Sequence, residues 1–152
     1  MLKKIIILFG FLFLSTTSNS EEIGSVDTAF KMLGPNHKIV IEAFDDPEIP
    51  GITCHLSRAK AGGLKGGLGV AEDKPDASIA CRQIGPIRLP KIIKNGDKVF
   101  TKKTSLLFKT IQVVRFLDKN RNVLVYLVYS NKIIDGSPKN SISTVPIVSW
   151  KK

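Results

Sequence analysis

Two cysteines, a histidine and a run of glycines lie close together in the chain, and their types could support chemistry. Cys54 and His55 are adjacent, and 26 residues separate Cys54 from Cys81. The segment GGLKGGLG lies between the two cysteines. Residues of these types occur in nucleophilic Cys–His sites, in phosphate-binding loops and in loops closed by a disulfide.

The two cysteines are better suited to a disulfide than to catalysis. A nucleophilic cysteine needs a thiolate and a base within hydrogen-bond reach. Neighbouring residues of a strand point to opposite faces, so His55 is poorly placed to activate Cys54, and His37 would have to approach from elsewhere. The chain also has no C-x-x-C motif. We therefore expect a structural disulfide between Cys54 and Cys81, with thiol catalysis and a redox-active disulfide as the alternatives.

The glycine run does not match the nucleotide-binding patterns. In a phosphate-binding loop Lys and Ser/Thr follow the second conserved glycine, but Leu68 and Gly69 stand in these positions after Gly67. The run could still bring backbone amides and lysines close to an anion, and the alternative is a turn-forming role. The candidate ligand loop comprises Arg58, Lys60, Gly62, Gly63, Lys65, Gly66, Gly67 and Gly69.

A metal site would need three or four converging ligands. The available residues are His37, His55 and the acidic group Asp45, Asp46 and Glu48. The acids lie around a proline, where a solvated hairpin loop is the simpler interpretation and where an aspartate would bond its own backbone. The sequence therefore predicts neither a metal nor a cofactor.

The N-terminal stretch MLKKIIILFGFLFLSTTSNS has the pattern of a secretory signal peptide. Its apolar run, Ile5 to Leu14, is ten residues long, too short for a membrane-spanning helix; the alternative is a retained N-terminal anchor. Ser18 and Ser20 suit signal peptidase, so we expect cleavage after Ser20. Residues 21–152 would then form one exported domain with no transmembrane segment.

The charge is unevenly distributed along the chain, whose formal net charge is +10. Residues 21–81 hold six basic and ten acidic residues, whereas residues 82–152 hold fifteen basic and three acidic ones. This pattern predicts a basic face that attracts an anionic envelope component or an acidic protein, and export argues against nucleic acid. The alternatives are a solvated basic surface and an attraction between the two halves. The candidate residues of the basic face are Lys102, Lys103, Lys109 and Arg115.

Short runs rich in Val, Ile, Phe and Thr between turn signals predict a mainly β fold. We expect a hairpin of 37–44 with 52–59, and a second hairpin around 118–122 whose arm 123–129 lies in the middle of a sheet. Pro146 limits the last stretch to an edge or an irregular segment. Short helical turns are expected at 26–33 and 90–95. The predicted fold is a single compact domain with a sandwich-like antiparallel sheet, one or two short helices and one disulfide.

Four long segments carry a resemblance to a known family. They are EEIGSVDTAFKMLGPNHKIVIEAFDDP, SRAKAGGLKGGLGVAED, TSLLFKTIQVVRF and YSNKIIDGSPKNSISTVP. Over nearly all of residues 21–152 the chain resembles the CreA family of small exported bacterial proteins. The resemblance implies a Gram-negative bacterium and a periplasmic location, and it supplies no catalytic or ligand-binding residues to carry over. A transcription factor is not expected, because a periplasmic domain does not meet the chromosome.

These observations favour a non-enzymatic binding or accessory module with an anionic ligand or partner. The glycine run and the basic C-terminal half would provide its contacts. The alternative is an enzyme, a hydrolase or an oxidoreductase, that uses His37, His55 and acidic residues.

Overall fold

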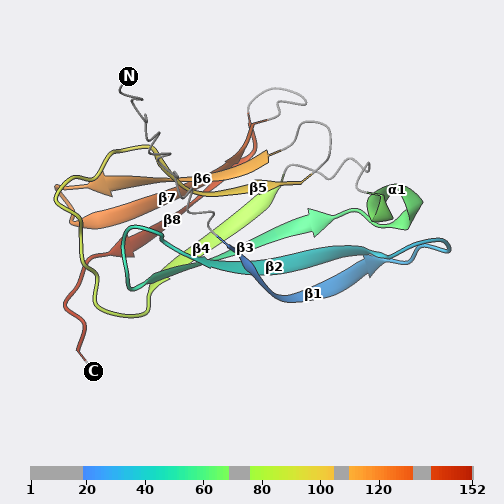
Figure 1. Cartoon of the computed structure of the whole chain (residues 1–152), viewed down its shortest axis with the longest axis horizontal. Coiled ribbons are helices and arrows are strands. Elements are labelled where there is room, and N and C mark those ends of the chain that lie inside the picture. The colour runs from blue at the N-terminus through green and yellow to red at the C-terminus, as the bar shows by residue number, and fades with distance from the viewer. Residues whose placement is uncertain (1–18, 69–75, 105–109, 132–137, 152) are drawn as a thin grey trace, which may run out of the picture.

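Two antiparallel sheets of four strands make up the protein. The computed structural model describes residues 19–68, 76–104, 110–131 and 138–151. Sheet A contains β1 (Glu21–Ala29), β2 (His37–Asp45), β3 (Ile52–Lys60) and β4 (Ala77–Gln83), in that order. Sheet B contains β5 (Asp97–Lys103), β6 (Thr110–Asp118), β7 (Val123–Ser130) and β8 (Asn140–Pro146), also in chain order. The helix α1 (Gly63–Gly67) follows β3 (Figure 1).

The strands form where apolar residues alternate with more polar ones. In β3, Ile52, Cys54 and Leu56 are buried, and the residues between them are half-buried or exposed. This period of two places one set of side chains on the inner face of the sheet. In β7 one set is fully buried and the other is half-buried, and β7 lies between β6 and β8 within sheet B. The mainly β fold and the central position of 123–129 are therefore confirmed.

The core lies between the sheets, which approach each other most closely where β4 lies beside β8. The rings of Phe44 and Phe100 stack at 4.3 Å between centroids and so join β2 to β5. The backbone N–H of Cys81 donates to the Ser143 hydroxyl at 2.8 Å, which links the edges of the two sheets. The predicted disulfide is confirmed: Cys54 and Cys81 are opposite each other on β3 and β4 and are bonded.

Both expected helical turns are wrong. Residues 26–29 belong to β1, because Val26 pairs with Ile39 and a β-branched side chain fits a strand. Residues 90–95 contain no helix. The Asn95 side chain accepts a hydrogen bond from the N–H of Leu117 at 2.9 Å, which draws this segment along β6. The one helix in the described residues, α1, lies within the glycine run.

The expected signal peptide falls largely on residues 1–18, which lie outside the described residues. Among the residues that are described, no helix is long and apolar enough to cross a membrane.

Candidate functional site

One end of sheet A gathers several strongly exposed apolar side chains together with several lysines. It consists of the β1–β2 loop with the start of β2, residues 30–38, and the end of β3 with α1, residues 60–68. We call this region the hairpin end. In Figure 1 it extends past the strands of sheet B, on the opposite side of the molecule from the C-terminus.

The glycine run positions the hairpin end through backbone contacts. The N–H of Gly63 donates to the carbonyl of Pro35 at 2.6 Å, and the N–H of Gly62 donates to Nδ1 of His37 at 2.9 Å. A Cβ atom at Gly62 would lie 2.1 Å from the Pro35 carbonyl oxygen, and one at Gly34 would lie 2.6 Å from the Gly63 carbonyl carbon. Glycine is therefore required here for close packing of two backbone segments.

The apolar side chains of the hairpin end are strongly exposed. Phe30 is 79 % exposed and Met32 is 88 % exposed. Single exposed apolar residues are ordinary on protein surfaces, whereas several of them at one end of a molecule are a candidate interaction site. The group as a whole contains Phe30, Met32, Leu33, Leu64 and Leu68.

Four lysines accompany this group: Lys31, Lys38, Lys60 and Lys65. Lys38 and Lys60 are directly opposite each other on β2 and β3. Like charges in this position destabilise a strand pair, so the fold alone does not account for them. Lys38 is also 3.7 Å from Glu22, whereas no ion pair of Lys31, Lys60 or Lys65 is found within the described residues.

A buried ionic group lies further along sheet A and involves two of the predicted site residues. Glu42 is buried and is 3.1 Å from Nε of Arg58 and 2.8 Å from Nζ of Lys102. Burial opposes ionisation of Glu42, but the hydrogen bonds and charges of Arg58 and Lys102 outweigh it and lower the pKa of Glu42. Arg58 and Lys102 are therefore engaged by a carboxylate inside the protein.

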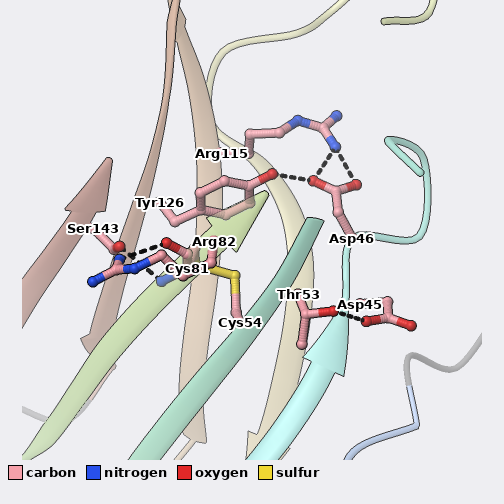
Figure 2. Close-up of a disulfide and its surroundings, with 9 residues drawn as sticks. All are labelled: Asp45, Asp46, Thr53, Cys54, Cys81, Arg82, Arg115, Tyr126 and Ser143. Atoms are coloured by element: carbon pink, nitrogen blue, oxygen red, sulfur yellow. Dashed lines mark hydrogen bonds and ion pairs between the residues drawn. A yellow bond between two sulfur atoms is a disulfide. The ribbon is translucent and has the colours of Figure 1, made fainter. Parts of the chain in front are cut away.

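Arg115 is not on an exposed basic face, because it is fully buried between the sheets. Its Nη1 atom is 2.6 Å from Oδ1 of Asp46, and the hydroxyl of Tyr126 donates to Oδ2 of Asp46 at 2.7 Å (Figure 2). The Nη2 atom of Arg115 also contacts Glu48. We call these four residues the Arg115 cluster. Burial acts to lower the pKa of Arg115, but its hydrogen bonds with Asp46 and Glu48 outweigh burial and raise that pKa overall. The pKa of Tyr126 is also raised, by burial and by the negative charge of Asp46.

The other predicted residues of the basic face do not form a group with Arg115. Lys103 is exposed at the end of β5, and Lys109 lies outside the described residues. In the candidate ligand loop, Gly62, Gly63 and Gly66 make close backbone contacts, and Lys60 and Lys65 are exposed. Gly69 also lies outside the described residues.

The histidines and the acidic group do not converge. His37 is at the hairpin end, and His55 lies on the same sheet about 20 Å further along the strands. Asp46 accepts hydrogen bonds from the N–H groups of Glu48 and Ile49, which confirms the expected aspartate turn. Across the described ranges no three His, Cys, Asp or Glu side chains are grouped as metal ligands.

Two local sequence signals point to features that the sequence-based predictions lack. Arg115 is flanked by Val113, Val114 and Phe116, and this apolar context indicates burial. The segment FKMLGPNHK alternates large apolar residues with lysines around a turn, which is an unusual composition for a loop.

Comparison with known proteins identifies relatives of the whole chain. A family model described as "CreA protein" matches residues 23–150. "Protein CreA" of Escherichia coli strain K12 is 56% identical over 154 residues, covering 99% of this chain and 98% of the relative. "Protein CreA" of Escherichia coli O157:H7 matches with the same identity and coverage. No solved structure shows a significant match.

Proposed function

The chain belongs to the CreA family, and we propose that it is a periplasmic, non-enzymatic binding or accessory module whose hairpin end contacts an anionic partner in the cell envelope. The observation that carries this proposal is the concentration of lysines and exposed large apolar side chains at one end of sheet A. A surface of this kind binds through charge attraction and apolar burial together.

Two features support export to the periplasm. The N-terminal sequence has the charged, apolar and small-residue regions of a signal peptide. The bonded pair Cys54–Cys81 suits an oxidising compartment, since disulfides persist there and are rare in the cytosol. Fractionation of cells, followed by mass measurement of the N-terminus, should find the protein in the periplasm and beginning at Glu21.

The chemistry of the described residues favours binding over catalysis. The two thiols are joined, and the two histidines lie far apart. The buried charges at Glu42 and Arg115 have partners inside the protein. The exposed lysines and apolar side chains of the hairpin end, by contrast, are available to another molecule.

The proposal is tested by capture from a native envelope fraction that contains both membranes and periplasmic proteins. The immobilised wild-type protein should retain an envelope component at low salt and release it at high salt, because exposed charges are screened. The variant Lys31→Gln/Lys60→Gln/Lys65→Gln should lose this capture.

The matched control is Lys91→Gln/Lys94→Gln/Lys119→Gln, which removes the same charge from exposed positions outside the hairpin end. It should behave as the wild type does. The proposal is wrong if no salt-sensitive component is captured, or if the two triple variants lose capture equally.

A further inference from the structure

We propose that the hairpin end docks the protein on the surface of an anionic phospholipid bilayer, with Phe30, Met32 and Leu33 entering the interfacial region of the lipid. This inference rests on the proposed function and names the partner of the same site. It follows from the kinds of side chain present, from their position at a protruding end of the molecule, and from the way the backbone holds them.

The apolar side chains are of the kind that enter a bilayer interface. Phe30, Met32 and Leu33 are consecutive but for one lysine, and Leu33 is 65 % exposed. Leu64 of α1 is close to them, since a Cβ atom at Gly34 would lie 3.0 Å from the Leu64 nitrogen. Burial of such side chains in the headgroup and acyl boundary is favourable in proportion to their apolar area.

The lysines lie beside these apolar side chains. Lys31 is within the loop, and its side-chain Cγ and Cδ would be 4.0 Å from a Cβ atom at Gly63. Lys38 and Lys60 are opposite each other behind the loop, and Lys65 is on α1. Lysine suits this role because its apolar stem can lie along the lipid boundary while its ammonium group meets phosphates without a fixed geometry.

The backbone of the hairpin end is held in place before any partner binds. The bonds from Gly62 and Gly63 join the start of α1 to the β1–β2 loop. The N–H of Lys31 donates to the Asn36 side chain at 2.9 Å, and Asn36 donates to Asp27 at 2.9 Å. The loop therefore presents its apolar side chains at a small cost in conformational entropy on binding.

This combination favours a bilayer over other anionic partners. A polysaccharide or an acidic protein segment would be bound by lysines alone and would leave Met32 and Leu33 in water. An apolar protein groove would accept the leucines but would not require four lysines around them. An anionic lipid interface offers an apolar layer for the exposed side chains and negatively charged headgroups for the lysines beside them.

The first test is sedimentation of the processed protein, recovered from the periplasm, with vesicles. Wild type should bind vesicles that contain phosphatidylglycerol and should bind poorly to vesicles of phosphatidylcholine alone. Partitioning should fall about fivefold for each of Lys31, Lys60 and Lys65 changed to Gln. It should fall at least about tenfold in Phe30→Ser/Met32→Ser/Leu33→Ser.

The matched control for the apolar side chains is Ile92→Ser, because Ile92 is 81 % exposed and lies between β4 and β5. Its partitioning should equal that of wild type. All variants carry the same N-terminus, so any residual signal sequence would contribute equally to each and would not produce a difference between them.

The second test measures insertion directly. Trp150 is the single tryptophan, near the C-terminal end that Figure 1 places opposite the hairpin end. Acyl chains brominated near the headgroup should leave Trp150 fluorescence unquenched in the wild type. They should quench the additional fluorescence of Phe30→Trp.

The inference is overturned if wild type does not bind phosphatidylglycerol vesicles, if it binds both vesicle types equally, or if the hairpin-end variants bind as Ile92→Ser does. It is also overturned if Phe30→Trp is not quenched while bound. Salt-sensitive capture from the envelope fraction without vesicle binding would reject the bilayer and leave the proposed function standing. Absence of both envelope capture and vesicle binding would reject the bilayer inference and the proposed function together.

Discussion

The Arg115 cluster and the hairpin end both combine positive charge with apolar residues, and they differ in what surrounds the charge. Arg115 is fully buried and bonded to Asp46 and Glu48, with Tyr126 completing the group. At the hairpin end Lys31, Lys60, Lys65 and the apolar side chains face solvent, whereas Lys38 is half-buried beside Glu22. Arg115 therefore holds the two sheets together, whereas Lys31, Lys60 and Lys65 are free to meet another molecule.

The comparison changes how the charge of the chain is interpreted. The C-terminal half is the more basic by count, yet Arg115 and Lys102 from that half are bonded to Asp46, Glu48 and Glu42 of the other half. Attraction between the two halves was one of the alternatives at the outset, and these pairs are instances of it. The accessible cluster of lysines and apolar side chains lies in the N-terminal half, which is acidic by count.

The largest effect is expected when the Arg115 cluster loses its cation. Arg115→Met leaves Asp46 buried beside Tyr126 without its charge partner, which should lower the free energy of unfolding by about 3–5 kcal/mol. Urea unfolding measures this loss of free energy in Arg115→Met, with Lys119→Gln as an exposed control. A loss under about 1 kcal/mol would mean that the cluster does not stabilise the fold and would remove the contrast with the hairpin end.

A slightly smaller effect is expected from removal of the disulfide between β3 and β4 of sheet A. Cys54→Ala/Cys81→Ala reopens a loop with 26 residues between the cysteines, and the chain-entropy model assigns its closure about 3.5 kcal/mol. Envelope capture should persist in the folded fraction, because the hairpin end does not contain the disulfide. Alkylation before and after reduction provides the check on the starting protein: thiols that react without reduction would contradict the bonded pair.

An intermediate effect, which depends on pH, is expected at Glu42. Its pKa is lowered in the folded protein, so its contribution is fully present above the ordinary glutamate pKa of about 4.3 and is lost as the pH falls through the lower folded value. Glu42→Gln should therefore cost about 2 kcal/mol at neutral pH. Thermal unfolding of both proteins from neutral to acidic pH should show this difference shrinking below about pH 4, and a constant difference would contradict the ionic role.

The smallest effect is expected at the hairpin end. Phe30→Ser/Met32→Ser/Leu33→Ser should change the free energy of unfolding by no more than about 0.5 kcal/mol, since these side chains are exposed and surface changes have little effect. Urea unfolding of this triple variant and of Arg115→Met, measured side by side, compares the smallest and the largest expected changes in the free energy of unfolding. If the triple variant were strongly destabilised, the apolar group would belong to the fold and not to a binding surface.

Local sequence patterns predicted the strands well because their burial is local information. Alternation in 37–44 and 52–59 and the apolar run 123–129 led to β2, β3 and β7. The disulfide followed from cysteine count and compartment. The Arg115–Asp46 pair was missed because its partners are 69 positions apart in the chain, and no local pattern reports such a contact. The role of the glycines was missed because it depends on Gly34 and Pro35, which come from another turn.

The chain order of the strands has a consequence for assembly. Each strand pairs with its neighbour in sequence, so sheet A is complete by Gln83 and sheet B begins at Asp97. A chain that enters an oxidising compartment from its N-terminus would deliver both cysteines, and every strand of sheet A, before any strand of sheet B. The covalent bond could then fix the register of β3 and β4 at once. The inner face of sheet A would wait uncovered, with Glu42 paired to Arg58 alone and Asp46 without its cation, until β5 supplied Lys102 and β6 supplied Arg115.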